Sequence, residues 1–316
     1  MTPDAEKIAN AMNRSKRELG KTGIMVSPLC YGCASVYGRD LISDQTAIDL
    51  FLMAHELGIN FFDTGRGYGM AEARIGAALK SVEQIDRESL VLSTKFDLCE
   101  SRQKIPQVFD LDWAKRSVEK SLETIGVDYL DIIMVHEPEP AAFFNESLFG
   151  FLEDIKRQGI AKAVGVNTYD ADFAERVARE KPLDVVMIDH NLVTKRHETI
   201  AKLHEAGIGV IAGQGLTQGS FFRKRFFVKN RKDFWYLMRS LKSPASRPLY
   251  PQAKKYRFIS GLRGFAPAHV ALNYALSDPN VSAVSFNSCD FSHLRQDAEA
   301  VTRELPKELF DRLRSL

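Results

Sequence analysis

The sequence predicts an α/β protein: a (β/α)8 TIM barrel with an N-terminal β-hairpin and an extended loop and helix insert between strands seven and eight. Eight short apolar runs alternate with longer amphipathic stretches along the 316 residues, as in a parallel sheet with helical crossovers. Glycines follow several amphipathic stretches, where helix C-termini often need a positive φ. No G-x-G-x-x-G follows the first run, which argues against an open doubly wound sheet.

The elements follow in a regular order. The expected strands cover residues 27–32, 59–62, 90–94, 129–135, 161–166, 185–188, 209–212 and 282–286. The expected helices cover residues 44–57, 71–79, 112–125, 146–158, 171–180, 197–206 and 267–277. Pro267 suits the first turn of the last helix, because proline lacks an N–H that would be unpaired there. With no linker or internal repeat, we expect a single domain over residues 1–316.

The insert spans residues 217–266 and contains the segment FFRKRFFVKNRKDFWY. Basic and aromatic residues interleaved in this way can bind nucleic acid. The favoured interpretation is an amphipathic helix with a solvated basic face that forms a lid, because loops on this face of a barrel commonly cover the active site.

Composition excludes several classes of protein. Lys and Arg number 43 and Asp and Glu number 41, giving a net charge of +2, which favours neither nucleic acid nor an anionic membrane as a partner. No apolar run reaches the ~20 residues that span a bilayer, and the polar N-terminus lacks the apolar core of a signal peptide. We therefore expect a soluble cytoplasmic protein. The oligomeric state is not readable from the sequence.

The cysteines and histidines do not predict a metal site. Reduced thiols are the expectation for the four cysteines, Cys30, Cys33, Cys99 and Cys289, since there are too few for a disulfide scaffold. Three histidines, at 190, 197 and 204, recur every seven residues, but only the last two fall in one expected helix. We expect no metal.

Four residues of unusual chemistry fall at or just after strand ends. Asp63 follows the apolar run INFF, and Tyr68 lies in the glycine-rich turn after it. Lys95 ends VLSTKF, and His136 ends LDIIMVH. Strand ends of a barrel meet on one face, so these four side chains can converge. Taken singly, each has an ordinary structural explanation: a turn cap, a loop aromatic, a surface lysine and a core histidine.

The set Asp63, Tyr68, Lys95 and His136 resembles the catalytic tetrad of the aldo-keto reductases. Residues 16–32, 159–167 and 207–222 resemble that family's opening hairpin with first strand, its fifth strand and its seventh strand with the following loop. The resemblance implies that Tyr68 protonates a carbonyl oxygen while a nicotinamide, NADPH by expectation, delivers hydride. It also implies that Lys95 lowers the pKa of Tyr68, that Asp63 holds Lys95, and that His136 donates to or orients the substrate oxygen.

The expected cofactor contacts are Asn167, Thr168, Gln214, Asn287 and Arg295. Several positions depart from the family pattern. Asn167-Thr168 replaces a Ser-Asn pair, Met187 stands where a glutamine is frequent, and Gln214 lies where an aromatic often stacks on the nicotinamide. Asp297 is expected to repel a 2′-phosphate.

Three functions are therefore open. The first is reduction of a small-molecule carbonyl substrate with a nicotinamide cofactor. The second is a non-redox lyase, isomerase or cyclase that uses the same four residues as acid and base without NADPH. The third is a binding or regulatory protein. Loop aromatics suggest a partly apolar ligand: Tyr37, Phe96, Trp113, Phe143 and Trp235. Glu137 at the mouth of the site could bind a substrate amine or hydroxyl.

Overall fold

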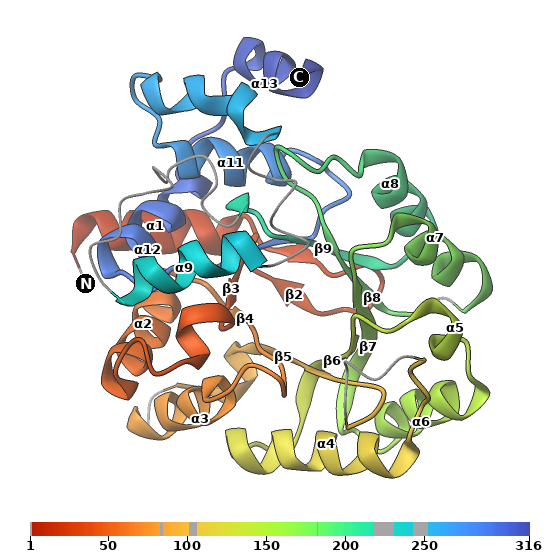
Figure 1. Cartoon of the computed structure of the whole chain (residues 1–316). Coiled ribbons are helices and arrows are strands. Elements are labelled where there is room, and N and C mark those ends of the chain that lie inside the picture. Colours follow the sequence, from red (N-terminus) through yellow and green to blue (C-terminus); the bar gives the residue numbers. More distant parts are fainter. Residues whose placement is uncertain (1, 83–84, 101–105, 182, 218–230, 243–251) are drawn as a thin grey trace.

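Eight parallel strands close into a barrel at the centre of the molecule, with helices packed around it (Figure 1). The computed structural model describes residues 2–82, 85–100, 106–181, 183–217, 231–242 and 252–316. The strands are β3 (Leu29–Gly32), β4 (Phe61–Asp63), β5 (Val91–Phe96), β6 (Leu130–His136), β7 (Ala161–Thr168), β8 (Val185–Asp189), β9 (Gly209–Gly213) and β10 (Ala283–Phe286). All eight overlap the predicted runs, so the predicted fold class is confirmed.

The register of the strands brings their carboxyl ends together. Around the barrel the order is β10, β3, β4, β5, β6, β7, β8 and β9, and each strand pairs in parallel with its neighbours. Asp63 lies opposite Gly32 on one side and Ser93 on the other. His136 lies opposite Asn167. The polar residues predicted at strand ends therefore share one face of the barrel.

Helices of the predicted type separate the strands. They are α2 (Asp44–Glu56), α3 (Ala71–Ser81), α4 (Leu111–Ile125), α6 (Glu146–Arg157), α7 (Ala171–Glu180), α8 (His197–Glu205) and α11 (Pro267–Leu276). Their bounds differ from the predicted ones by two residues or fewer. Side-chain caps begin several of them. Ser43, Asp110 and Asp170 each accept from a main-chain N–H in the first turn of the helix that follows, which satisfies a donor that the helix itself leaves unpaired.

Several further elements were not predicted. The polar N-terminus forms α1 (Pro3–Arg14), which buries Ala5, Ile8 and Met12 along one side. Short or late helices complete the chain: α5 (Pro140–Phe143), α12 (Phe291–Ala298), α13 (Lys307–Ser315) and the 3-10 turns η1 (Ser35–Gly38), η2 (Arg87–Ser89), η4 (Lys254–Gly261) and η5 (Glu299–Thr302). Only three residues of α1 form its buried side, and most of the others are polar or small, so the hydrophobic periodicity of this segment is weak.

The apolar core has two layers, one inside the barrel and one between the strands and the surrounding helices. Side chains that point inward form one cluster, which includes Phe61, Ile132, Met134 and Ile211. The predicted hairpin, β1 (Arg17–Glu18) and β2 (Met25–Val26), is present and antiparallel. Its residues Leu19, Ile24 and Val26 belong to this inner cluster. The outer layer packs the strands against the helices.

The insert after β9 is described in part. Residues 231–242 form α9 (Arg231–Lys242), in agreement with the helix expected there, and the earlier part of FFRKRFFVKNRKDFWY lies outside the described residues. Arg39 places its guanidinium carbon 5.1 Å from the centre of the Trp235 ring, so α9 contacts the turn that follows η1. No helix in the described ranges is long and apolar enough to cross a membrane.

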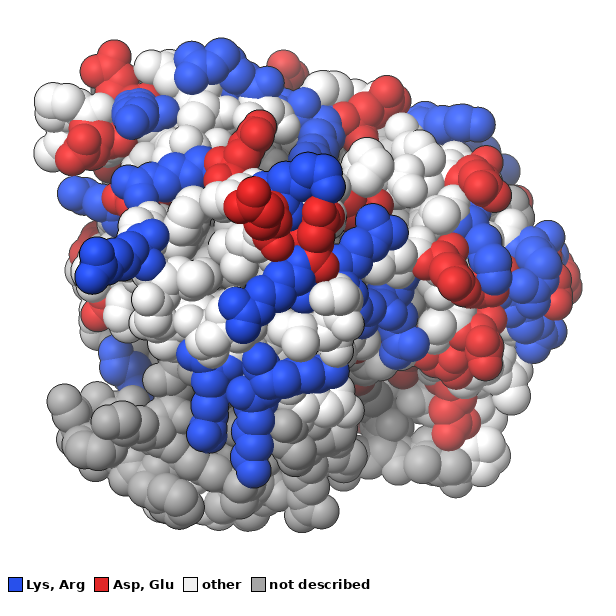
Figure 2. Space-filling view, turned by 90° about the horizontal axis from the view of Figure 1, so that it is seen from above, with Lys and Arg blue, Asp and Glu red and all other residues white. Residues whose placement is uncertain are grey.

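Charged side chains of both signs are interspersed on the face seen in Figure 2. No single sign dominates the described part of that face. This distribution agrees with the near-neutral composition.

Candidate active site

A buried ion pair forms the base of the site. Lys95 Nζ lies 2.5 Å from Asp63 Oδ2 and also donates to the Thr64 carbonyl at 2.9 Å. The other Asp63 oxygen accepts from Ser93 Oγ at 2.6 Å. The Lys95 side chain is fully buried, and an ammonium in the interior requires such a partner. Burial is the largest single influence and disfavours the charge, but Asp63, Tyr68 and Cys30 together outweigh it and raise the pKa of Lys95 to about 12.

Tyr68 reaches this pair from the loop after β4. Its amide donates to the Gly65 carbonyl at 2.9 Å, which closes a tight turn. The backbone of Gly38 in η1 packs directly on this loop: a Cβ at that position would lie only 1.7 Å from the Tyr68 carbonyl oxygen. Lys95 Nζ lies 5.1 Å from the centre of the Tyr68 ring. The predicted neighbours therefore do meet.

His136 completes the group at the end of β6. Its Nε2 lies 3.4 Å from the Tyr68 hydroxyl, and its Nδ1 lies 3.3 Å from Asp97 Oδ1. Because a carboxylate only accepts, Asp97 favours a proton on Nδ1. Neutral His136 then accepts from the Tyr68 hydroxyl, whereas protonated His136 donates to it. The four predicted residues lie together on the carboxyl face of the barrel.

The protonation of Tyr68 differs from the expectation. Burial is the largest influence and raises the pKa of Tyr68. Lys95 lowers that pKa, as expected, but does not outweigh burial, and the carboxylates of Asp63 and Glu137 raise it further. Tyr68 is therefore a neutral phenol near pH 7. The pKa of Tyr68 is therefore raised, where a lowered pKa was expected. A neutral phenol can still donate a proton, so Tyr68 can still act as a general acid.

Two neighbours of the site, Ser93 and Asp97, were missed as functional residues. A signal existed, because side chains alternate along a strand. Ser93, Lys95 and Asp97 are spaced by two, and all three direct polar groups to the site.

The expected nicotinamide contacts lie on the same face. Asn167 is opposite His136, is buried, and has its amide 3.4 Å from the Met187 carbonyl. Thr168 accepts from the Asp170 amide, which places its hydroxyl in the turn before α7. Gln214 follows β9 with a left-handed φ of 55°. Met187 points into the apolar barrel interior. Asn167 and Gln214 carry amides suited to a carboxamide, whereas the Met187 side chain offers no amide to bind one.

The expected phosphate contacts are less uniform. The Asn287 amide donates to the Gly32 and Ala34 carbonyls, so it ties β10 to β3. Arg295 is exposed on α12. Asp297, expected to repel a phosphate, is 3% exposed, and burial raises its pKa to about 8. That expectation was wrong: Asp297 faces the protein and is mostly neutral near pH 7, so it leaves Arg295 able to meet an anion.

Several loop aromatics belong to the core. Tyr37, Phe96 and Phe143 are at most 1% exposed, so they do not line a ligand pocket. The four cysteines are free thiols. Burial raises the pKa of both Cys30 and Cys33, which leaves them protonated.

A cluster that the sequence did not predict joins His190, His197 and Asp278, whose polar atoms lie within 4.8 Å of one another. His197 bonds Asp278 at 2.7 Å and the Tyr274 hydroxyl at 3.1 Å. His190 Nδ1 accepts from the Arg196 amide, and burial lowers the His190 pKa to about 4. In the neutral ring the proton therefore sits on Nε2, which makes this atom a donor and not a metal ligand.

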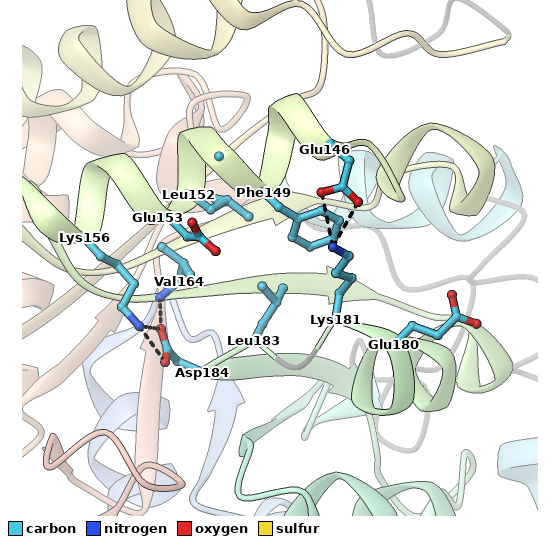
Figure 3. Close-up of a pocket in the computed structure, with 11 residues that line it drawn as sticks. Glu146, Phe149, Leu152, Glu153, Lys156, Val164, Glu180, Lys181, Leu183 and Asp184 are labelled. Atoms are coloured by element: carbon cyan, nitrogen blue, oxygen red, sulfur yellow. Dashed lines mark hydrogen bonds and ion pairs between the residues drawn. The ribbon is translucent and has the colours of Figure 1, made fainter.

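A separate surface pocket lies between α6 and α7 (Figure 3). Its volume is about 440 Å³. Its lysines are already paired, Lys156 with Asp184 at 2.7 Å and Lys181 with Glu146 at 3.0 Å. Val164 and Asp184 place the pocket toward the amino ends of β7 and β8, away from the four residues above.

The fold and the site define a parallel barrel with a Tyr, Lys, Asp and His group at the carboxyl ends of its strands. The chain belongs to the aldo/keto reductase family, whose model matches residues 28–316. Members of this family are oxidoreductases that act on small molecules with a nicotinamide cofactor.

Known proteins resemble the chain at a distance. It is 26% identical to an L-galactose dehydrogenase of Arabidopsis thaliana over 90% of this chain and 88% of that protein. It is 28% identical to an NADH-specific methylglyoxal reductase of Escherichia coli over 65% and 68%. The solved structure of an aldo-keto reductase from Bacillus halodurans in its holo form matches with a TM-score of 0.72 at 22% identity, covering 95% of each chain. This last likeness concerns the fold.

Proposed function

We propose that this protein reduces a carbonyl compound with a nicotinamide cofactor, NADPH in the first instance, and that Tyr68 is the proton donor. The observation that carries the proposal is the buried Lys95–Asp63 pair beside Tyr68, with His136 at 3.4 Å from the phenol. A fixed cation beside a neutral phenol is suited to general acid catalysis, because the cation stabilises the phenolate that remains after proton transfer.

Each residue of the site has a separate role in the proposed reduction. A nicotinamide held on this face by Asn167 and Gln214 would supply the hydride that the carbonyl carbon accepts. Tyr68 gives its proton to the carbonyl oxygen, so the C=O bond becomes an alcohol and the phenolate remains. Lys95 stabilises that phenolate, and Asp63 holds Lys95 in position. His136 orients the substrate oxygen when it carries a proton on Nε2 as well as on Nδ1, because Nε2 is then a donor. Asp97 orients the His136 ring through Nδ1.

The described residues fit the cofactor in part. The amides of Asn167 and Gln214 suit a nicotinamide carboxamide, and exposed Arg295 suits a phosphate. The relatives named for dehydrogenase and reductase activities support the redox chemistry. The absence of an amide at Met187 supports the second candidate, a non-redox acid–base enzyme.

A nucleotide titration separates these candidates. We expect NADPH to change the intrinsic fluorescence of the protein with a micromolar dissociation constant, and Tyr68→Phe to keep this binding while losing more than about a hundredfold in carbonyl reduction. If NADPH and NADH do not bind at millimolar concentrations while the protein still converts a substrate, the non-redox function is correct instead.

A further inference from the structure

The loop that carries Tyr68 connects β4 to α3, and its first half is attached to β5. The Thr64 amide donates to the Ser93 carbonyl at 2.8 Å, and the Arg66 amide donates to the Lys95 carbonyl at 2.9 Å. These two hydrogen bonds continue the pairing of β4 with β5 beyond the last residue of β4. The position of the loop is therefore set at the end of the strand that carries Lys95.

Gly65 contacts both residues whose separation matters for the proposed reaction. A Cβ at Gly65 would lie 3.3 Å from Cε2 of Tyr68 and 3.5 Å from Cβ of Lys95. The Tyr68 amide also donates to the Gly65 carbonyl at 2.9 Å. Tyr68 therefore rests on Gly65, and a movement of this part of the loop relative to β5 would change the distance between the phenol and the ammonium.

A single buried carboxylate, that of Glu72 in the first turn of α3, holds this part of the loop. Its Oε2 accepts from Arg66 Nη1 at 2.5 Å, and its Oε1 accepts from Thr94 Oγ1 at 2.8 Å. Arg66 directly follows Gly65 in the chain. Thr94 directly precedes Lys95, and because neighbouring side chains of a strand point to opposite faces, it points outward to α3. Glu72 thereby joins the loop, α3 and β5.

The needs of α3 alone do not explain why Glu72 is buried. An acid in the first turn of a helix offsets the partial positive charge of the N-terminus, and Asp44, Asp112 and Asp172 take this place in α2, α4 and α7. All three are exposed, whereas Glu72 is 2% exposed. Burying a carboxylate is costly unless it is paired and hydrogen-bonded. The contacts of Glu72 with the loop and with β5 therefore compensate for its burial.

We propose that Glu72 is a positioning residue for the proton transfer from Tyr68. By binding Arg66 and Thr94 at the same time, it holds the loop against β5. The phenol of Tyr68 thereby stays beside the ammonium of Lys95. This inference rests on the proposed function, because Glu72 acts on the reaction through Tyr68.

Two substitutions at Glu72 separate its contacts from its charge. Glu72→Leu removes both contacts and leaves no charge buried, because Arg66 is partly exposed. A displacement of about 1 Å can cost about a hundredfold in rate, so Glu72→Leu should lower kcat for reduction of methylglyoxal by NADPH at least about tenfold. KM and the dissociation constant of NADPH should stay within about twofold. Glu72→Gln should keep kcat within about threefold of wild type, since its amide can accept from Arg66 and donate to Thr94.

Asp131 provides a matched control near the amino ends of β5 and β6. Its carboxylate is also buried and also uses both oxygens, which lie 2.9 Å from Arg87 Nη2 and 2.8 Å from Lys162 Nζ. It accepts from the Leu92 amide of β5 as well. Asp131→Leu loses more contacts than Glu72→Leu, so it should lower the melting temperature at least as much, but it should leave kcat within about twofold.

Several kinetic results would overturn the inference. One is a kcat for Glu72→Leu within about twofold of wild type. Another is an equal loss of kcat in Glu72→Gln or in Asp131→Leu, because the lost charge or the lost stability would then explain the effect. If Glu72→Leu does not fold, Thr94→Val removes one of the two contacts and should lower kcat about threefold. An unchanged kcat in Thr94→Val would then count against Glu72.

Hydrogen exchange tests the same hold on the loop without any turnover. If wild type reduces no carbonyl compound, the proposed function has failed, and this measurement decides the inference separately. The amides of Arg66 and Tyr68, followed by NMR, should exchange at least about tenfold faster in Glu72→Leu than in wild type, and at unchanged rates in Asp131→Leu. Unchanged exchange of both amides in Glu72→Leu would overturn the inference.

Discussion

The buried charge of Lys95 makes Asp63→Asn the most informative single substitution. The carboxylate lies 2.5 Å from Nζ, and at an effective dielectric constant of about 20 the gross attraction is ~7 kcal/mol. The Thr64 carbonyl remains as a partner, and Lys95 can also lose its proton. Removing a proton from a group with a pKa of about 10.5 costs ~5 kcal/mol at pH 7. This cost is an upper limit on the destabilisation caused by Asp63→Asn. We therefore expect Asp63→Asn to lower the free energy of unfolding by ~3–5 kcal/mol.

The pH dependence has a definite sign. In the wild type the pKa of Lys95 is raised from 10.5 to about 12, so the pair stabilises fully below pH ~10.5 and loses this effect between that pH and about 12. In Asp63→Asn the carboxylate that opposed burial is gone, so burial, the largest influence on Lys95, lowers the pKa of Lys95. The variant then gains stability as the pH rises toward 10.5, and its deficit should shrink by ~1.4 kcal/mol per pH unit once Lys95 is neutral.

Urea unfolding at pH 7 and pH 9 measures both effects. Adding Lys95→Met to Asp63→Asn removes the unpaired charge and should recover most of the loss. Asp154→Asn, which breaks an exposed pair with Arg157, should cost less than ~1 kcal/mol. A deficit below ~1 kcal/mol for Asp63→Asn, or one that does not fall with pH, would refute the reasoning.

Two further substitutions test the packing that supports the site. Gly165→Ala in β7 places a Cβ 2.3 Å from the Val185 carbonyl oxygen, so it should lower the free energy of unfolding by ~1–3 kcal/mol. Gly150→Ala in α6 meets nothing within 4 Å and should raise the free energy of unfolding by up to ~1 kcal/mol. Equal melting temperatures for the two variants would contradict this. Arg74 is 3% exposed and donates hydrogen bonds to three main-chain carbonyls as well as to Asp44. Arg74→Met should therefore lower the free energy of unfolding, measured in urea, by ~3 kcal/mol or more. A loss under ~1 kcal/mol would show that water replaces those hydrogen bonds.

The strands and most helices could be predicted because their patterns are local. The run at 59–62 is apolar and ends at a carboxylate. Glycines such as Gly58 and Gly126 follow the helical stretches, and both have the positive φ expected there. The convergence of Asp63, Lys95 and His136 followed from the topology, since all three end parallel strands. Helix α1 was missed because only three of its residues, Ala5, Ile8 and Met12, are buried and most of the others are polar or small.

What the sequence could not provide were effects of three-dimensional surroundings. The raised pKa of Tyr68 depends on how completely protein encloses the hydroxyl. The burial of Asp297 depends on which side of α12 faces the protein. The meeting of His190 with Asp278 joins residues 88 positions apart by number, and the left-handed turn at Glu137 has no signal in residue type.

The most direct test of the central claim is an isotope-transfer measurement. The protein would be incubated with NADPH deuterated at the transferable position and with a carbonyl substrate, and the product would be analysed by mass spectrometry. The account predicts an alcohol that carries the deuterium, with formation abolished by Tyr68→Phe. A product free of deuterium, formed while the nucleotide remains unoxidised, would contradict it.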